Sequence, residues 1–275
     1  MFKGIRKTTK RAFDESLRFR AQMLPQPELA QDAWVVAPHP DDETLGCGGT
    51  IAEKSAQGAR VYVVFVSDGS GSHARWMNRA DLAARRKTEG YEACDRLGVR
   101  SEDVQFLDLP DGDLTNHVER GTASLARLFS DRPVEQFFIP HRLEPPPDHA
   151  AAAAMAMGGL REARLKGTVL EYPVWMWARW PWVPRGDDPN RDQSTIRQAP
   201  VIAAGVREMM SELRWRVDVR PQITNKRQAL ACHETQTRRF AEATEWPVLS
   251  DIAGGEFLEC FFSGWEYFHR FVAPE

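Results

Sequence analysis

The 275-residue sequence contains no paired-cysteine motif, no long apolar segment and no excess of basic charge. Its four cysteines are far apart, which argues against a Cys-type zinc site and fits a reducing, cytoplasmic environment. No run of about 18 apolar residues occurs, so we expect no transmembrane segment, and the basic start lacks the apolar core of a secretory signal. A formal net charge of -3 argues against a nucleic-acid-binding protein.

What the sequence does contain is an alternation of predicted strands and helices in a globular composition, 42% hydrophobic and 27% charged. Short apolar runs predict buried strands at 33–37, 60–67, 103–109, 136–140 and 168–172. Helical spacing of apolar residues predicts helices at 44–57, 78–97, 117–129 and 148–163. This alternation predicts an α/β fold, a Rossmann-like parallel sheet with helices on both faces in three α/β/α layers.

The ends of the chain and one polar segment complete the predicted organisation. We expect residues 1–31 to form a helical amino-terminal extension that ends near Pro25, and residues 32–275 to form a single domain. Residues 184–200 are rich in Asp, Pro, Arg, Asn and Gln, which predicts a loop or mobile lid. A further helix is predicted over 226–237. The oligomeric state is open, and a homo-oligomer is one option.

The clearest motif, PHPDDE, directly follows the first predicted strand. Two adjacent carboxylates and an imidazole on a tight turn are costly unless a positive charge lies among them, and a divalent metal would supply it. Catalytic zinc usually has three protein ligands and an open position for water. His149 follows the fourth strand, and the carboxyl ends of parallel strands meet at one edge of a sheet. We therefore predict that His39, Asp42 and His149 bind Zn²⁺.

Asp41 lies beside the predicted ligands without being one of them. A carboxylate there would act as general base on a water molecule activated by the zinc, which would then attack an amide carbon. The metal would stabilise the developing oxyanion. The alternative interpretation of the acidic triplet is a charge cluster at a helix N-terminus. The preceding strand, His39 and the glycine-rich continuation favour the catalytic interpretation over that one. Asp148, taken alone, is equally well explained as an N-cap.

The segment VVAPHPDDETLGCGG resembles the PIG-L/LmbE-like family of zinc-dependent N-deacetylases. Weaker similarities follow in family order over roughly residues 33–235, at 67–69, 85–89, 97–99, 106–114 and 226–236. The resemblance implies a Rossmann-like fold, Zn²⁺, and removal of an N-acetyl or other N-acyl group from an amino sugar such as N-acetylglucosamine, or from a glycoside. It also implies that His39 and Asp42 are metal ligands and that Asp41 is the general base.

The family's second motif resembles residues 142–149, with one departure. His149 matches the third metal ligand, and Asp148 matches the residue that orients the motif's first histidine. Pro146 replaces that histidine, which in the family stabilises the intermediate or protonates the leaving amine, and proline can do neither. Three remedies are open: His141, His73 or His233 reaches in, Arg142 holds the oxyanion, or the protein is a catalytically impaired paralogue that binds metal and has a binding role.

Other interpretations remain beside the hydrolase. Tryptophans at positions 175, 177, 180 and 182 could stack on a sugar ring, or pack in a core edge or interface. Two histidines and one carboxylate are also the ligands of some iron oxygenases, but the adjacent Asp41 and the parallel sheet favour a hydrolase. A nucleotide-binding protein needs a bare glycine-rich loop where this sequence has carboxylates.

Overall fold

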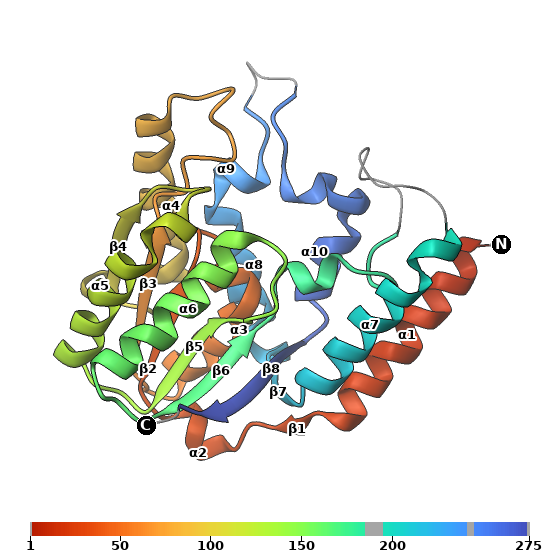
Figure 1. Cartoon of the computed structure of the whole chain (residues 1–275), viewed down its shortest axis with the longest axis horizontal. Coiled ribbons are helices and arrows are strands. Elements are labelled where there is room, and N and C mark those ends of the chain that lie inside the picture. The colour runs from red at the N-terminus through yellow and green to blue at the C-terminus, as the bar shows by residue number, and fades with distance from the viewer. Residues whose placement is uncertain (1, 185–194, 241–244, 274–275) are drawn as a thin grey trace.

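The computed structural model describes residues 2–184, 195–240 and 245–273 (Figure 1). In these ranges eight strands form one sheet in the order β1-β7-β8-β6-β5-β2-β3-β4. The strands are β1 (Gln22–Met23), β2 (Ala33–Ala37), β3 (Val61–Ser67), β4 (Val104–Leu109), β5 (Gln136–Pro140), β6 (Thr168–Tyr172), β7 (Trp215–Asp218) and β8 (Trp265–Val272). The helices are α1 (Phe2–Arg20), α2 (Gln26–Leu29), α3 (Asp42–Ala56), α4 (Arg79–Arg96), α5 (Val118–Asp131), α6 (Pro147–Glu162), α7 (Thr195–Glu212), α8 (Ile223–Cys232), α9 (Glu234–Thr237) and α10 (Glu256–Phe261).

The α/β fold predicted from the sequence is confirmed. All five predicted strands are present, and they pair in parallel in the order β6-β5-β2-β3-β4. The sheet as a whole is mixed, because β8 runs antiparallel to both β6 and β7. The carboxyl ends of the parallel strands therefore share one edge, where the motif after β2 and the loop after β5 come together.

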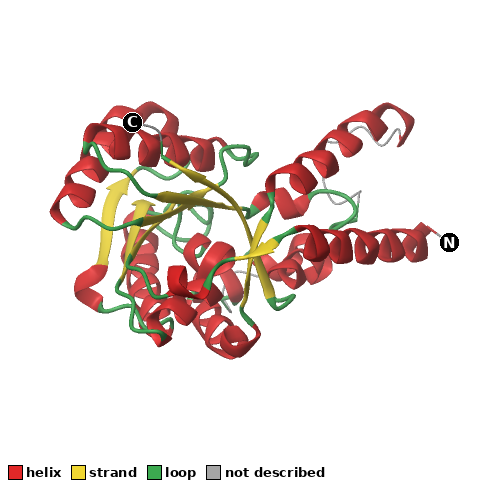
Figure 2. Ribbon diagram, turned by 90° about the horizontal axis from the view of Figure 1, so that it is seen from below, coloured by secondary structure: helices red, strands yellow, loops and turns green. Residues whose placement is uncertain are grey.

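Alternate residues of the central strands enter two separate hydrophobic cores. Val35 and Val63 pack with residues of α3, α4 and α8 on one face of the sheet. Val36 and Val64 pack with residues of α5 and α6 on the other face. This period of two follows from strand geometry, in which successive side chains point to opposite faces. Figure 2 shows the helices on both sides of the twisted sheet, as the three-layer prediction requires.

The amino-terminal extension is helical, as predicted. Leu17 of α1 is buried in the first core, and Arg6 donates a 3.0 Å hydrogen bond to the carbonyl of Pro181. After α1 the chain adds the short strand β1 to the sheet, which the sequence did not reveal. In the described ranges, none of the helices is both long and apolar enough to pass through a membrane.

Two other predicted segments differ from the structure. Of the predicted loop at 184–200, residues 185–194 lie outside the described residues, and residues 195–200 begin α7 instead of continuing a loop. The predicted helix at 226–237 is interrupted, because α8 ends at Cys232 and α9 begins at Glu234. His233 between them has non-helical backbone angles, φ -74° and ψ 64°. The interruption directs the His233 side chain toward the turn after β2.

Candidate metal centre and active site

The turn after β2 places three acidic side chains in the protein interior. Asp41, Asp42 and Glu43 are each at most 6% exposed. Asp41 has a φ of 134°, in the region that non-glycine residues rarely occupy, and such strain costs about 1–3 kcal/mol unless the surroundings hold it. Its amide donates to Glu43 Oε2 at 3.0 Å, and its carbonyl accepts the amide of Leu45 at 2.9 Å. The predicted base, Asp41, thus has a strained backbone that these hydrogen bonds hold in place.

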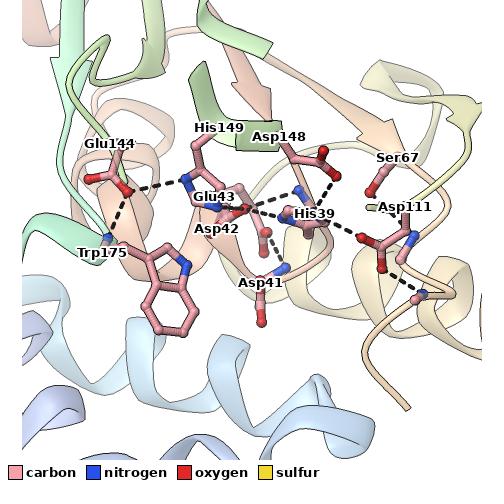
Figure 3. Close-up of polar contacts among 12 residues, drawn as sticks. His39, Asp41, Asp42, Glu43, Ser67, Asp111, Glu144, Asp148, His149 and Trp175 are labelled. Atoms are coloured by element: carbon pink, nitrogen blue, oxygen red, sulfur yellow. Dashed lines mark hydrogen bonds and ion pairs between the residues drawn. The ribbon is translucent and has the colours of Figure 1, made fainter. Parts of the chain in front are cut away.

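The three predicted metal ligands lie together. Nδ1 of His39 is 3.2 Å from Oδ2 of Asp42, and Nε2 of His149 is 3.4 Å from the same oxygen. One donor atom from each residue lies within 4.8 Å of the others, which is the arrangement a single cation needs (Figure 3). Ring centroids of the two histidines are 5.4 Å apart, so the imidazoles are close enough to share an ion.

His149 supplies the best test of whether a cation fits this site. The residue is 0% exposed, and neither ring nitrogen makes a hydrogen bond within the described residues. Each nitrogen instead faces a carboxylate, Nε2 toward Asp42 and Nδ1 toward Glu144 Oε2 at 3.2 Å (Figure 3). A buried polar atom without a partner is costly, and a metal at Nε2 would remove that cost. The donor set of two imidazoles and one carboxylate therefore fits a divalent transition metal.

Asp111 and Asp148 hold His39 from the side away from His149. Nε2 of His39 lies 3.1 Å from Asp111 and 3.4 Å from Asp148. Burial opposes a charged ring, but the hydrogen bonds to Asp111, Asp148 and Asp42 win and raise the pKa of His39 well above its ordinary value. These carboxylates therefore favour positive charge at the site, whether a proton or a metal cation supplies it.

Backbone amides fix both of these carboxylates. Asp148 accepts the amides of Gly112 at 2.8 Å and Leu114 at 3.1 Å, and Asp111 accepts the amide of Gly71 at 2.7 Å. Asp148 is thus no N-cap of its own helix, because α6 has no side-chain cap. These hydrogen bonds hold the Asp111 and Asp148 carboxylates in place beside Nε2 of His39, where they can orient its ring.

Glu144 is a site residue that the sequence analysis did not single out. Besides facing His149, its carboxylate accepts the amides of Val174 at 2.9 Å, Trp175 at 2.7 Å and Met176 at 3.1 Å. It therefore connects the third predicted ligand to the loop after β6. A signal was available, because Glu144 stands where the family's second motif has an aspartate, but the sequence analysis assigned that position no role.

Asp41 has the properties of a general base. Burial and the neighbouring Asp42 carboxylate raise its pKa to about 7, while Arg86, His233 and His39 lower it in part. A carboxyl that titrates near neutral pH can both accept and return a proton. In Figure 3 the ring of Trp175 lies on the same side of the His39–His149 group as Asp41.

The three histidines considered as replacements for the missing family histidine all have other partners. His233 is buried and its Nε2 lies 2.8 Å from Glu43, the residue that holds the Asp41 amide. His73 lies 2.9 Å from the carbonyl of Pro247 and stacks on Trp246, and His141 accepts the amide of Leu143 at 3.1 Å. His233 therefore lies nearest to the predicted base, as a support for its turn.

Arg142 and two of the four tryptophans have their described contacts away from the three predicted metal ligands. The Arg142 guanidinium contacts Glu171 and Glu212, so its predicted role at the oxyanion stays a prediction without a supporting contact. Trp177 and Trp182 are buried in the core beside α1, and Nε1 of Trp182 donates to Asp14 at 2.8 Å. Of the four tryptophans, only Trp175 has a described contact that ties it to the site. Pro146 precedes α6 and offers only its carbonyl, to the amide of His149 at 3.1 Å.

Comparison with known sequences supports the predicted resemblance. Residues 34–158 match the family model described as PIG-L, GlcNAc-PI de-N-acetylase, so the resemblance to that family is confirmed. The diacetylchitobiose deacetylase of Thermococcus kodakarensis is 30% identical over 137 residues, 47% of this chain and 49% of that protein. The match thus spans about half the length of this curated relative.

Solved structures show the same fold. The N,N'-diacetylchitobiose deacetylase of Pyrococcus horikoshii aligns over 96% of this chain and 92% of that chain, with a TM-score of 0.62 and 20% identity. The 4-carboxy-2-hydroxymuconate hydratase GalB of Pseudomonas putida aligns over 84% of each chain, with a TM-score of 0.53 and 17% identity. Because the same fold supports a deacetylase and a hydratase, function must be argued from the site.

Proposed function

We propose that this chain is a zinc-dependent hydrolase that removes an N-acetyl group from an amino sugar or glycoside, because residues 34–158 match the PIG-L family model. The observation that carries the proposal is the buried, unpartnered Nε2 of His149, which faces Asp42 beside His39. The named relatives are deacetylases of an N-acetylated sugar, which supports the substrate class. The impaired-paralogue alternative gains no support from the comparisons.

His39, Asp42 and His149 would hold the cation. When bound, Zn²⁺ polarises a carbonyl oxygen and a water molecule, and it stabilises negative charge on oxygen. Asp111 and Asp148 keep the His39 ring in place, and Glu144 does the same for His149. These outer carboxylates also increase the basicity of the imidazoles.

Asp41 would move the protons. Its carboxylate takes a proton from water as the oxygen attacks the amide carbon, and its carboxyl returns a proton to the leaving amine as the C–N bond breaks. In the metal-free protein burial and Asp42 raise the pKa of Asp41 to about 7, and this environment favours a carboxyl that can exchange its proton. This shuttle gives the reaction a proton donor although Pro146 stands where the family has a histidine.

An acetate-release screen over N-acetylated sugars, N-acetylglucosamine and diacetylchitobiose included, tests the proposal. We expect acetate from at least one of them, loss of release after chelation, and recovery with added Zn²⁺. Asp41→Asn should slow release by about 10²–10⁴-fold while zinc stays bound. Asp131→Asn, at an exposed position on α5, should behave as the wild type. Zinc-loaded, folded protein that releases no acetate from any N-acetylated sugar would contradict the proposal.

A further inference from the structure

A second group of histidines and carboxylates lies on three neighbouring strands, separate from the His39 site. Glu171 of β6 and His269 of β8 are direct partners in the antiparallel register. His141 follows β5 and extends its pairing, because its amide donates to the carbonyl of Tyr172 at 2.9 Å. Glu212, the last residue of α7, approaches the same point from outside the sheet. Four elements thus converge on one position.

The three strand residues project from one face of the sheet. Ile139, Val169 and Phe271 pack in the core beneath α5 and α6. Side chains two residues apart on a strand point the same way, so His141, Glu171 and His269 lie on that face too. His141 is 0% exposed, Glu171 is 1% exposed and His269 is half-buried.

Three of the distances within the group are close to those between the ligand atoms of a tetrahedral metal, and the fourth is a hydrogen bond. Nε2 of His141 is 3.7 Å from Glu171 Oε2 and 3.8 Å from Glu212 Oε2. Nε2 of His269 is 3.6 Å from Glu212 Oε2, and its Nδ1 is 2.8 Å from Glu171 Oε2. Ligand atoms about 2.1 Å from a tetrahedral zinc lie about 3.4 Å from one another. Donor atoms of His141, Glu171 and His269 all lie within 4.8 Å of one another.

His141 points to a ligand that is not a protein group. Its Nε2 is buried and has no hydrogen-bond partner within the described part of the chain. The amide of Leu143 donates to Nδ1, so the ring proton lies on Nε2. A cation at Nε2 would therefore require the other tautomer, with the ring proton on Nδ1, and the Leu143 amide would lose its hydrogen bond to that nitrogen.

Arg142 now supplies positive charge at this point. Its guanidinium contacts Glu171, and it donates to Glu212 at 2.6 Å and lies 2.8 Å from His269 Nδ1. The side chain is 44% exposed, so it can move into solvent without breaking the core. We propose that His141, Glu171, Glu212 and His269 form a second site for a divalent transition-metal cation, which Arg142 vacates when the cation enters. Mixed imidazole and carboxylate ligands suit Zn²⁺ or Co²⁺.

Zinc stoichiometry of tag-free protein tests this proposal independently of catalysis. Wild-type protein dialysed against Zn²⁺ should hold about two equivalents, and a His39→Gln/His149→Gln variant should keep about one. Adding His269→Gln to that variant should weaken the remaining zinc at least about tenfold. His117→Gln is the matched control, because His117 pairs with Asp113 outside both groups and should leave the stoichiometry unchanged.

The outcomes separate this site from the first one. If the His39→Gln/His149→Gln variant folds, as judged by circular dichroism, yet holds no zinc, the second site is refuted whatever the acetate assay shows. If that variant does not fold, single substitutions in the wild-type protein give the answer. His269→Gln and Glu171→Gln should then each reduce the bound zinc from about two equivalents to about one. Retention of the wild-type stoichiometry in both single variants would refute the proposal.

Discussion

Nε2 of His149 lies 3.4 Å from Oδ2 of Asp42 in the protein interior, with no hydrogen bond to any described residue. The two side chains come from strand ends that are more than 100 residues apart in the chain, and the parallel pairing of β2 with β5 brings them together. Since an orphaned imidazole nitrogen and a buried carboxylate are each costly alone, their meeting is best explained by a cation between them.

Replacing Glu144 with glutamine should weaken zinc binding although Glu144 is no ligand. Glutamine keeps the size but loses the negative charge that faces Nδ1 of His149, so the imidazole becomes less basic. We expect the zinc dissociation constant to rise about 10–100-fold, measured by competition with a chromogenic chelator. Glu135→Gln, at an exposed position, is the control. Equal zinc affinities for the two variants would show that Glu144 does not support metal binding through His149.

The rate of deacetylation should fall with acid because Asp41 must be ionised to accept a proton. Burial and Asp42 place its pKa at about 7 in the metal-free protein, and a bound cation lowers it. We therefore expect kcat/KM of zinc-saturated enzyme to decrease tenfold per pH unit below a midpoint at or under about 7.

Asp41→Asn should remove this acid limb and lower kcat by about 10²–10⁴-fold. A rate that falls as the pH rises through 7, or a variant with the wild-type pH profile, would show that another group is the base. Zinc content measured on the same samples separates a lost base from a lost metal.

Two glycines of α3 should respond differently to alanine. A Cβ at Gly46 would lie 2.1 Å from the ring of Tyr172, which is buried and donates its hydroxyl to the carbonyl of Val36 at 2.7 Å. Because the ring cannot move freely, Gly46→Ala should lower the free energy of unfolding by about 1–3 kcal/mol. A Cβ at Gly48 meets its nearest neighbour at 3.4 Å, an ordinary contact, so Gly48→Ala should be neutral or stabilising. Equal urea-denaturation midpoints would contradict this packing.

Lys54 should make stability depend on alkaline pH. Its ammonium is buried, where it donates to Gln136 at 2.7 Å and to the carbonyl of Glu28 at 2.9 Å, and burial lowers its pKa from 10.5 to about 8. Between these values the unfolded chain binds more protons at this site than the folded protein, so the free energy of unfolding rises with pH.

Relative to Lys54→Met, wild-type protein should therefore gain up to about 3 kcal/mol between pH 8 and pH 10.5. Denaturation curves of both proteins at several pH values measure the difference, and other titrating groups cancel in the comparison. A difference that does not change with pH would show that Lys54 keeps its proton throughout.

The sequence was most informative where local pattern and tertiary role agree. The run AWVVA is apolar, short and flanked by turn residues, and it forms β2 with the predicted bounds. The grouping of His39, Asp42 and His149 could be predicted from the chemistry of the motif after this strand and from the rule that the carboxyl ends of parallel strands meet at one edge of the sheet.

Prediction was weakest where a residue's partner is distant in sequence. Strand β8 contains His269 and Arg270 among aromatic residues, and only its pairing with β6 and β7 makes it a strand. Glu144 is held at the site by the amides of Val174 and Trp175, which only the fold brings near it. His233 reaches the turn after β2 because the chain is interrupted between α8 and α9. A tryptophan such as Trp182 could stack on a sugar ring, but here α1 covers the side chain and it is part of the hydrophobic core.

The most direct test of the central claim is anomalous diffraction at the zinc edge from crystals of the zinc-loaded protein. We expect a peak within bonding distance of Nδ1 of His39, a carboxylate oxygen of Asp42 and Nε2 of His149, about 2.0–2.2 Å from each. Zinc-loaded crystals with no anomalous peak between these three side chains would contradict the account.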